Sequence, residues 1–201
     1  MKKLLCMVVL LGFCGTAGAA LADEAVQPLP KPGVLNEETI FTDKRLSLYD
    51  TIILREFKTE GATYENLDED AEKTKLEAMK PLLVRTLVDS TEVELKIRKM
   101  FKNIQKGGEA KGSAVILEGS FTEFNGGSRA VRFWVGFGAG KTYLKIKGRL
   151  IDAQSGKELA TFEDQETGYK GMATMESFSD LFPHQAKSCG ENIADFIQKL
   201  Y

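Results

Sequence analysis

The stretch of this chain whose residue types most suggest chemistry is Gly126–Gly140, GGSRAVRFWVGFGAG, which Lys141 follows. Its last residues and Thr142 match the end of a phosphate-binding loop, in which backbone N–H groups and a lysine hold phosphate oxygens. That loop needs its first glycine at position 135, which is Val135 here, and it must run into a helix. The residues from 142 to 151 instead alternate between polar and apolar side chains, which predicts a strand. Spacing and context therefore both argue against a nucleotide site.

Two interpretations of this glycine stretch remain open. In the first, the glycines at 136, 138 and 140 are structural, because they bare one face of an extended segment or let it bulge and turn. In the second, aromatic side chains flanked by cations form a tip that contacts another protein subunit or a membrane surface, since such residues suit both interfaces. The candidate interaction tip consists of Arg129, Arg132, Phe133, Trp134, Phe137 and Lys141.

Other reactive residue types give no catalytic or metal-binding pattern. His184 is the only histidine, no G-x-S-x-G motif is present, and nothing marks a nucleophile beside His184. Acidic residues cluster at the expected start of a helix, where they complement the helix dipole; a divalent-cation site is the alternative. These acidic residues are Glu65, Asp68, Glu69, Asp70 and Glu72. We predict no catalytic residue, no metal ligand set and no cofactor.

The N-terminus has the features of a secretory signal. Lys2 and Lys3 precede the apolar segment Leu4–Phe13, and an A-x-A cleavage site ends at Ala22. We therefore expect cleavage after Ala22 and a periplasmic protein. Lipidation at Cys14, with attachment to the outer membrane, is the weaker alternative, because a lipoprotein signal has a small residue where Phe13 stands.

Charge and cysteine content narrow the class of partner. Without residues 1–22 the chain has 179 residues, with 25 basic and 29 acidic side chains, and a net charge of −4. No basic run is present, which argues against nucleic acid. Cys189 is the one remaining cysteine, so no intrachain disulfide is possible. We expect Cys189 in the core, because it shares an apolar helical stripe.

The periodicity of the chain predicts one domain behind a tether. Residues 23–45 contain three prolines and read as an extended tether, and residues 46–201 read as a single domain. Strands are expected at 46–57, 113–124, 143–152 and 158–166, with a hairpin turn at 152–157. On the third of these strands, a basic row alternates with the apolar residues. It lies opposite Glu158 and Glu163 and reads as a solvated sheet face, not as a ligand groove.

Helices are expected on either side of these strands. One begins near Asp68, with Pro81 marking a kink or a junction, and a helical period continues to Ile104 with Ser90 or Thr91 as a cap. A short edge strand at 101–104 is the alternative for the end of this region. The last helix is expected at 184–200. The predicted fold class is α+β, a mainly antiparallel sheet of about four strands with helices packed on one face.

The sequence resembles a known family along most of residues 48–200. The matching segments are AVILEGSF at 114–121, GSRAVR at 127–132, VGFGAGK at 135–141 and LIDAQSGK at 150–157. They are similar to the bacterial envelope family of domain of unknown function 4410, many of whose members look like lipoproteins. The element order is more distantly similar to the periplasmic domains of the curli secretion channel lipoprotein and of the activators of penicillin-binding proteins. The resemblance implies a location and a fold rather than an activity.

We therefore expect a non-catalytic periplasmic or outer-membrane-associated protein that acts as an interaction or assembly module. Its partner would be another envelope protein or further copies of itself, with contact to a membrane surface as an additional mode. The alternative is a periplasmic hydrolase or small-ligand-binding protein whose site comes from scattered residues. Convergent carboxylates with shifted pKa values in a pocket would favour that alternative.

Overall fold

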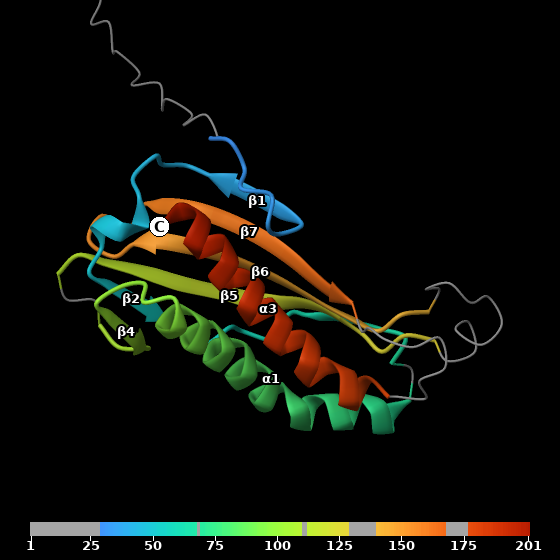
Figure 1. Cartoon of the computed structure of the whole chain (residues 1–201). Helices are drawn as coiled ribbons and strands as arrows, with labels where there is room; N and C mark the ends of the chain where they lie inside the picture. The colour runs from blue at the N-terminus through green and yellow to red at the C-terminus, as the bar shows by residue number, and fades with distance from the viewer. Residues whose placement is uncertain (1–28, 68, 110–111, 129–139, 168–176) are drawn as a thin grey trace, which may run out of the picture.

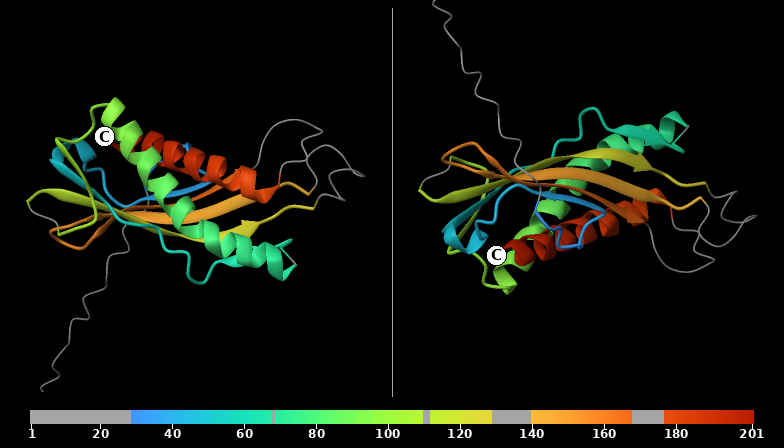
Figure 2. Two further views of the ribbon diagram at one scale, coloured as in Figure 1. Left: turned by 90° about the horizontal axis from the view of Figure 1, so that it is seen from below. Right: turned by 90° about the horizontal axis from the view of Figure 1, so that it is seen from above.

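The protein folds as two layers, a twisted β-sheet and a pair of helices that cover one of its faces (Figures 1 and 2). This arrangement comes from a computed structural model, which describes residues 29–67, 69–109, 112–128, 140–167 and 177–201. In the view from above in Figure 2 the sheet lies in front of both helices, and in the view from below the helices lie in front. Neither of these helices therefore covers the second face of the sheet.

The sheet has seven strands and mixed direction, so the predicted four-stranded, mainly antiparallel sheet is wrong. The strand order is β1-β7-β6-β5-β2-β4, and β3 pairs with the second half of β5. β1, β7, β6 and β5 are antiparallel neighbours, whereas β2, β3 and β4 run parallel to their partners. The strands are β1 Glu37–Ile40, β2 Thr51–Leu54, β3 Thr63–Glu65, β4 Asn103–Lys106, β5 Ala114–Asn125, β6 Tyr143–Asp152 and β7 Glu158–Thr167.

The parallel pairing of β2 with β4 follows from the helix that lies between them in the chain. A long crossover returns the chain to the same end of the sheet, and here α1, Asp70–Ile97, connects the β2 region to β4. The edge strand considered at 101–104 is present two residues later, as β4. Within the segment predicted as a tether, residues 37–40 form β1 and pair with β7.

α1 is one continuous helix of 28 residues that contains Pro81 in its interior. The expected cap at Ser90 or Thr91 is wrong, because both residues lie inside this helix. Their hydroxyl groups donate instead to the carbonyl oxygen of Leu87, at 3.0 and 2.9 Å. Serine and threonine hydroxyl groups can form this hydrogen bond to the preceding turn in the interior of a helix. Their presence in the sequence therefore does not by itself mark the start of a helix.

α3, Phe178–Leu200, begins six residues before the start that the sequence suggested. Ser177 precedes it, and its backbone N–H donates to the Asp180 carboxylate at 3.1 Å, as in a capping box. Pro183 lies within the first two turns and does not prevent the helix from forming. Among the described residues, neither helix is long and apolar enough to cross a membrane.

The main core lies between the helices and one face of the sheet. Each helix contributes an apolar stripe, and each long strand contributes alternate residues such as Leu144, Ile146 and Leu150 on β6. Phe121, Phe124 and Phe182 are stacked or tilted against one another at the centre of this layer. A second, small cluster of Ile53, Ala114 and Ile116 lies on the other face. That remaining face is mostly polar, and it carries the candidate site.

Candidate functional site: the uncovered face of the sheet

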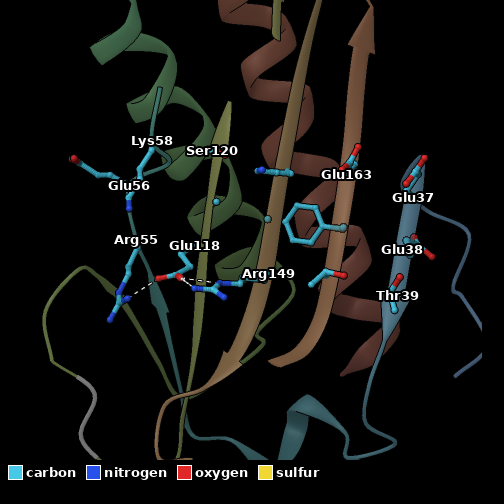
Figure 3. Close-up of a pocket in the computed structure, with 15 residues that line it drawn as sticks. Glu37, Glu38, Thr39, Arg55, Glu56, Lys58, Glu118, Ser120, Arg149 and Glu163 are labelled. Atoms are coloured by element: carbon cyan, nitrogen blue, oxygen red, sulfur yellow. Dashed lines mark hydrogen bonds and ion pairs between the residues drawn. The ribbon is translucent and has the colours of Figure 1, made fainter. Parts of the chain in front are cut away.

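A broad groove crosses the face of the sheet that the helices leave bare (Figure 3). Its volume is about 560 Å³, and it extends over β1, β7, β6, β5 and the residues that follow β2. Its lining residues are Glu37, Glu38, Thr39, Arg55, Glu56, Lys58, Glu118, Gly119, Ser120, Lys147, Gly148, Arg149, Thr161, Phe162 and Glu163. The surface that these residues form is called the groove below.

Small residues form the centre of the groove floor. Gly119 and Gly148 are paired across β5 and β6. On the core side, a β-carbon at Gly148 would lie less than 3.0 Å from the ring of Phe162. A β-carbon at Gly119 would likewise collide with the ring of Phe57. The two glycines thus let aromatic rings lie directly against the strands, while Ser120 occupies the groove side.

One end of the groove holds a compact network of ion pairs. The Glu118 carboxylate lies between Arg55 and Arg149, 2.6 Å from the guanidinium of each (Figure 3). Arg149 also contacts Glu158 at 2.7 Å. Partial burial alone would raise the pKa of Glu118, but the hydrogen bonds from the two arginines outweigh it and lower that pKa. Glu118 is therefore a carboxylate held in its charged form, which suits electrostatic recognition and not proton donation.

Residues paired across neighbouring strands form rows that run across the sheet. The row next to Glu118 and Arg149 on this face also carries charges, but in the described chain these charges do not form ion pairs with one another. The strand registers place Glu37 beside Glu163, Glu163 beside Lys147, and Lys147 beside Ser120. A bridge then places Lys58 beside Ser120. This transverse row, called the charge row below, runs from two acids at β1 and β7 to two lysines at β6 and beyond β5. Within the described part of the chain, no ion pair or side-chain hydrogen bond joins these four charges.

The row on the other side of the charge row is again internally paired. Lys145 contacts Glu123 at 2.7 Å, and the Tyr143 hydroxyl also donates to Glu123. The hydrogen bond that Lys145 donates to Glu123 is the main reason that the pKa of Lys145 is raised, and Glu163 adds a smaller attraction. The charge row thus lies between two neutralised rows, and its polarity is exposed to whatever contacts this face.

Two carboxylates with raised pKa values lie elsewhere, between β7 and α3. Asp164 is 5 % exposed and Glu166 is half-buried, and burial raises the pKa of both. The Asn192 side-chain amide donates to Asp164 at 3.0 Å and to Glu166 at 2.6 Å. Alternation along β7 puts these two side chains on the helix-covered face, so neither lines the groove. The convergent, shifted carboxylates that would favour a hydrolase are therefore not in this surface.

Most of the candidate interaction tip predicted from sequence lies outside the described residues. Five of its six residues are not described: Arg129, Arg132, Phe133, Trp134 and Phe137. The sixth, Lys141, is described and is exposed to solvent.

The base of the glycine stretch has a defined structure. The Ser128 N–H donates to the Gly140 carbonyl oxygen at 3.0 Å, and the Gly127 N–H donates to the Asn125 side chain at 2.8 Å. Gly127 has φ +70°, a conformation that L side chains rarely adopt. Of the three glycines in the structural interpretation, Gly140 is described and has φ +71°, whereas Gly136 and Gly138 lie outside the described residues, so that interpretation stays a prediction.

The other residues singled out from sequence take structural positions. Cys189 is buried in α3, as predicted, and burial raises the pKa of its thiol well above the ordinary value. His184 is exposed on α3, which is in the helical layer away from the groove. Asp70 and Glu72 lie in the first turn of α1. Where the chain is described, no group of three His, Cys, Asp or Glu side chains could hold a metal ion.

Sequence reasoning identified this face of the sheet but predicted a solvated face without a ligand groove, and it missed the charge row. The basic row on residues 143–149 was recognised as a sheet face opposite Glu158 and Glu163, and both oppositions are present. Glu37 and Lys58 gave no such signal, because they come from short segments on either side that only the strand order brings to this face.

Comparison with solved structures finds chains of similar outline at low identity. The PelC dodecamer from Paraburkholderia phytofirmans is 10 % identical, with a TM-score of 0.42, and the match covers 78 % of this chain and 96 % of that chain. Protein XCC0632 from Xanthomonas campestris is 8 % identical, with a TM-score of 0.42, and the match covers 87 % and 91 % of the two chains.

Comparison by sequence places the chain more firmly. No curated protein matches it. The family model described as Domain of unknown function (DUF4410) matches residues 52–171, the region from β2 to just beyond β7. This match spans well over half of the chain, and the protein therefore belongs to the family of domain of unknown function 4410.

Proposed function

We propose that this protein is a non-catalytic module of the bacterial cell envelope that binds another protein through the groove. The observation that carries this proposal is the charge row, a polarised line of charges on a sheet face that neither helix covers. Its four charged members form no ion pair within the described residues. The location in the envelope is supported by the signal-like sequence of residues 1–22.

The chemistry of the groove favours binding over catalysis. Its central carboxylate, Glu118, is fully engaged by two arginines. Its hydroxyl groups, such as Ser120, have no histidine beside them, because His184 lies in the helical layer. A nucleophile needs a neighbouring base to become reactive, and the described residues of this face include no histidine to serve as that base.

The dimensions of the groove favour a protein as the ligand. Four interstrand steps separate β1 from the segment after β2, which is about 19 Å at roughly 4.8 Å per step. Sites for small molecules are concave enough to bury most of the ligand, whereas this face is broad and open. Charges spread over such a distance can be matched by a polypeptide surface that presents several side chains at once.

Site-specific cross-linking in cells tests this proposal. A photo-reactive residue at Thr161, on the groove, should give a covalent adduct with another polypeptide in the envelope. The same residue at Arg85, exposed on α1, is the matched control and should give none. Lys147→Glu should remove the Thr161 adduct if the charge row is responsible, whereas equal adducts at both positions would contradict the proposal.

The candidate interaction tip supplies the competing assignment. In the triple variant Arg129→Ala, Arg132→Ala, Trp134→Ala, the Thr161 adduct should persist if the groove is the binding surface. Loss of the adduct in this variant, with normal secretion and folding, would transfer the binding role to the glycine stretch.

A further inference from the structure

We propose that the protein bound in the groove is a second copy of this chain, related by a two-fold axis that runs parallel to the central strands. This inference rests on the proposed function, since it names the partner for the same surface. It follows from the polarity of the charge row. Across the sheet, the order of its residues is Glu37, Glu163, Lys147, Ser120 and Lys58, so the acids lie at one end and the lysines at the other.

A row of this polarity is complementary to its own reverse. When two identical sheet faces meet about a two-fold axis along the strands, each transverse row is reversed relative to its partner's row. The acid end of one row then faces the lysine end of the other. An axis that runs across the strands along the charge row would instead place each residue of this row opposite itself, and lysine would face lysine.

An axis between β6 and β7 gives the best match within the charge row. Lys147 of one copy then faces the partner's Glu163, and the symmetric pair repeats this contact. Lys147 and Glu163 of the same copy are already opposite each other across β6 and β7. The four side chains therefore form a quartet of alternating charge at the centre of the interface. Glu37 faces the partner's Ser120, whose hydroxyl can donate to a carboxylate.

The adjacent row is compatible with the same axis. Register places Thr39 beside Thr161, Thr161 beside Arg149, and Arg149 beside Glu118. Reversal places Thr161 opposite the partner's Arg149, and Thr39 opposite the partner's Glu118. Both contacts join a hydroxyl to a charged group, and neither opposes like charges. The small threonines also leave room for the long arginine of the other copy.

The quartet is much stronger in an interface than on a free surface. A solvent-exposed pair of Lys147 and Glu163 in one chain contributes little, because water and salt screen it. Within an interface, alternating charges steer the encounter and penalise every misaligned register. Association should therefore weaken as ionic strength rises.

Charge exchange between copies tests this inference. The full secreted protein should sediment as a dimer, and Glu163→Lys and Lys147→Glu should each raise the dimer dissociation constant at least tenfold. Positions 147 and 163 are both basic in Glu163→Lys and both acidic in Lys147→Glu. An equimolar mixture of these two variants should therefore dimerise again. The double variant, with both changes in one chain, should also recover dimerisation.

Two controls separate association from folding. Lys73→Glu, on the exposed side of α1, changes the net charge as Lys147→Glu does and should leave the dimer unchanged. Each single variant should keep the wild-type unfolding midpoint of its monomer.

A monomeric wild-type protein at all accessible concentrations would overturn the inference, as would failure of the mixture to associate. If that monomer still gave a Thr161 adduct with a different protein, the proposed function would stand without the second copy. Absence of both the dimer and the adduct would overturn both proposals.

Discussion

The contact between α1 and α3 is expected to tolerate no side chain at Gly190. A β-carbon added at this position would lie less than 3.0 Å from the Ser90 side chain and from the carbonyl oxygen of Leu87. The Thr91 hydroxyl also bridges the helices here, since it contacts the carbonyl oxygens of Leu87 at 2.9 Å and of Gly190 at 3.2 Å. Replacement of Gly190 by alanine must therefore push α3 away from α1.

The magnitude of this effect comes from two opposing contributions. In an isolated helix, Gly→Ala would stabilise by about 1 kcal/mol. Overpacking a rigid core contact costs about 1–3 kcal/mol, and the obstacle here includes a backbone atom that cannot rotate away. Separation of the helices also weakens the bridge from Thr91, a hydrogen bond whose net contribution is about 1 kcal/mol. We expect a net destabilisation of about 2 kcal/mol for Gly190→Ala.

Urea unfolding of residues 23–201 measures this change. Reaction of the Cys189 thiol, the one cysteine in that segment, with a maleimide gives a local readout, because Cys189 is buried in the native state and becomes accessible when the helices separate. Ser90→Ala is the control, and it should change stability by less than about 0.5 kcal/mol. Ser90→Gly in the Gly190→Ala background should recover only part of the loss, since Leu87 remains. If Gly190→Ala proved as stable as the wild type, the tight helix crossing would be refuted.

Two further predictions concern ionisation. Asp164 is buried, and burial raises its pKa in the folded protein above its pKa in the unfolded chain. The contribution of Asp164 to the free energy of unfolding is therefore fully present below the unfolded pKa and is lost as pH rises through the folded pKa. Asp164→Asn should therefore stabilise the protein by about 1 kcal/mol at pH 7.5 and by nothing near pH 3, as measured by urea unfolding at both pH values. A constant difference would contradict the linkage. The pKa of Asp152 is lowered to about 2, first by the Tyr49 hydroxyl at 2.7 Å and then by backbone N–H groups. Its stabilising effect is present above its ordinary pKa of 3.8 and is lost as pH falls towards 2. Asp152→Asn should cost about 1 kcal/mol at pH 7, a value reduced for solvent screening, and this cost should disappear at about pH 2 in the same assay.

The elements that sequence predicted well are those whose local pattern is reinforced by burial. β6 was placed at its observed bounds, because Leu144, Ile146 and Leu150 alternate with polar residues over ten positions. β7 and the turn between them followed from the same pattern and from Gly156. In these strands the apolar residues face the core, so periodicity and tertiary structure agree.

The strands that sequence missed, or offered only as an alternative in the case of β4, are short and lie at the margins of the sheet. β1, β3 and β4 have three or four residues each, and their composition is mostly polar. A single apolar residue such as Ile104 gives no period, and charged edge strands resemble loops. Their positions depend on pairing with distant partners, so the mixed direction of the sheet could not be inferred from local pattern.

The groove was hidden for the same reason. Ser120, Lys147 and Glu163 belong to predicted strands, but the register between them depends on the bulge in β5 and on the length of the β6–β7 turn. Glu37 and Lys58 are separated from these strands by tens of residues. The row, with acids at one end and lysines at the other, is formed only by the pairing of all five residues across the folded sheet.

The symmetry inferred for the groove has a consequence for the predicted tip. A two-fold axis parallel to the strands leaves the direction of each strand unchanged, so the strand ends at Asn125 and Tyr143 point the same way in both copies. The charge row lies four residues from Tyr143 on β6, about 13 Å at roughly 3.3 Å per residue. The ends of β5 and β6 therefore lie at one common end of the dimer. A pair of weak contacts made from one end of a dimer gains from effective concentration. In such a dimer the groove holds the two copies together, and any contact made at this common end is present twice.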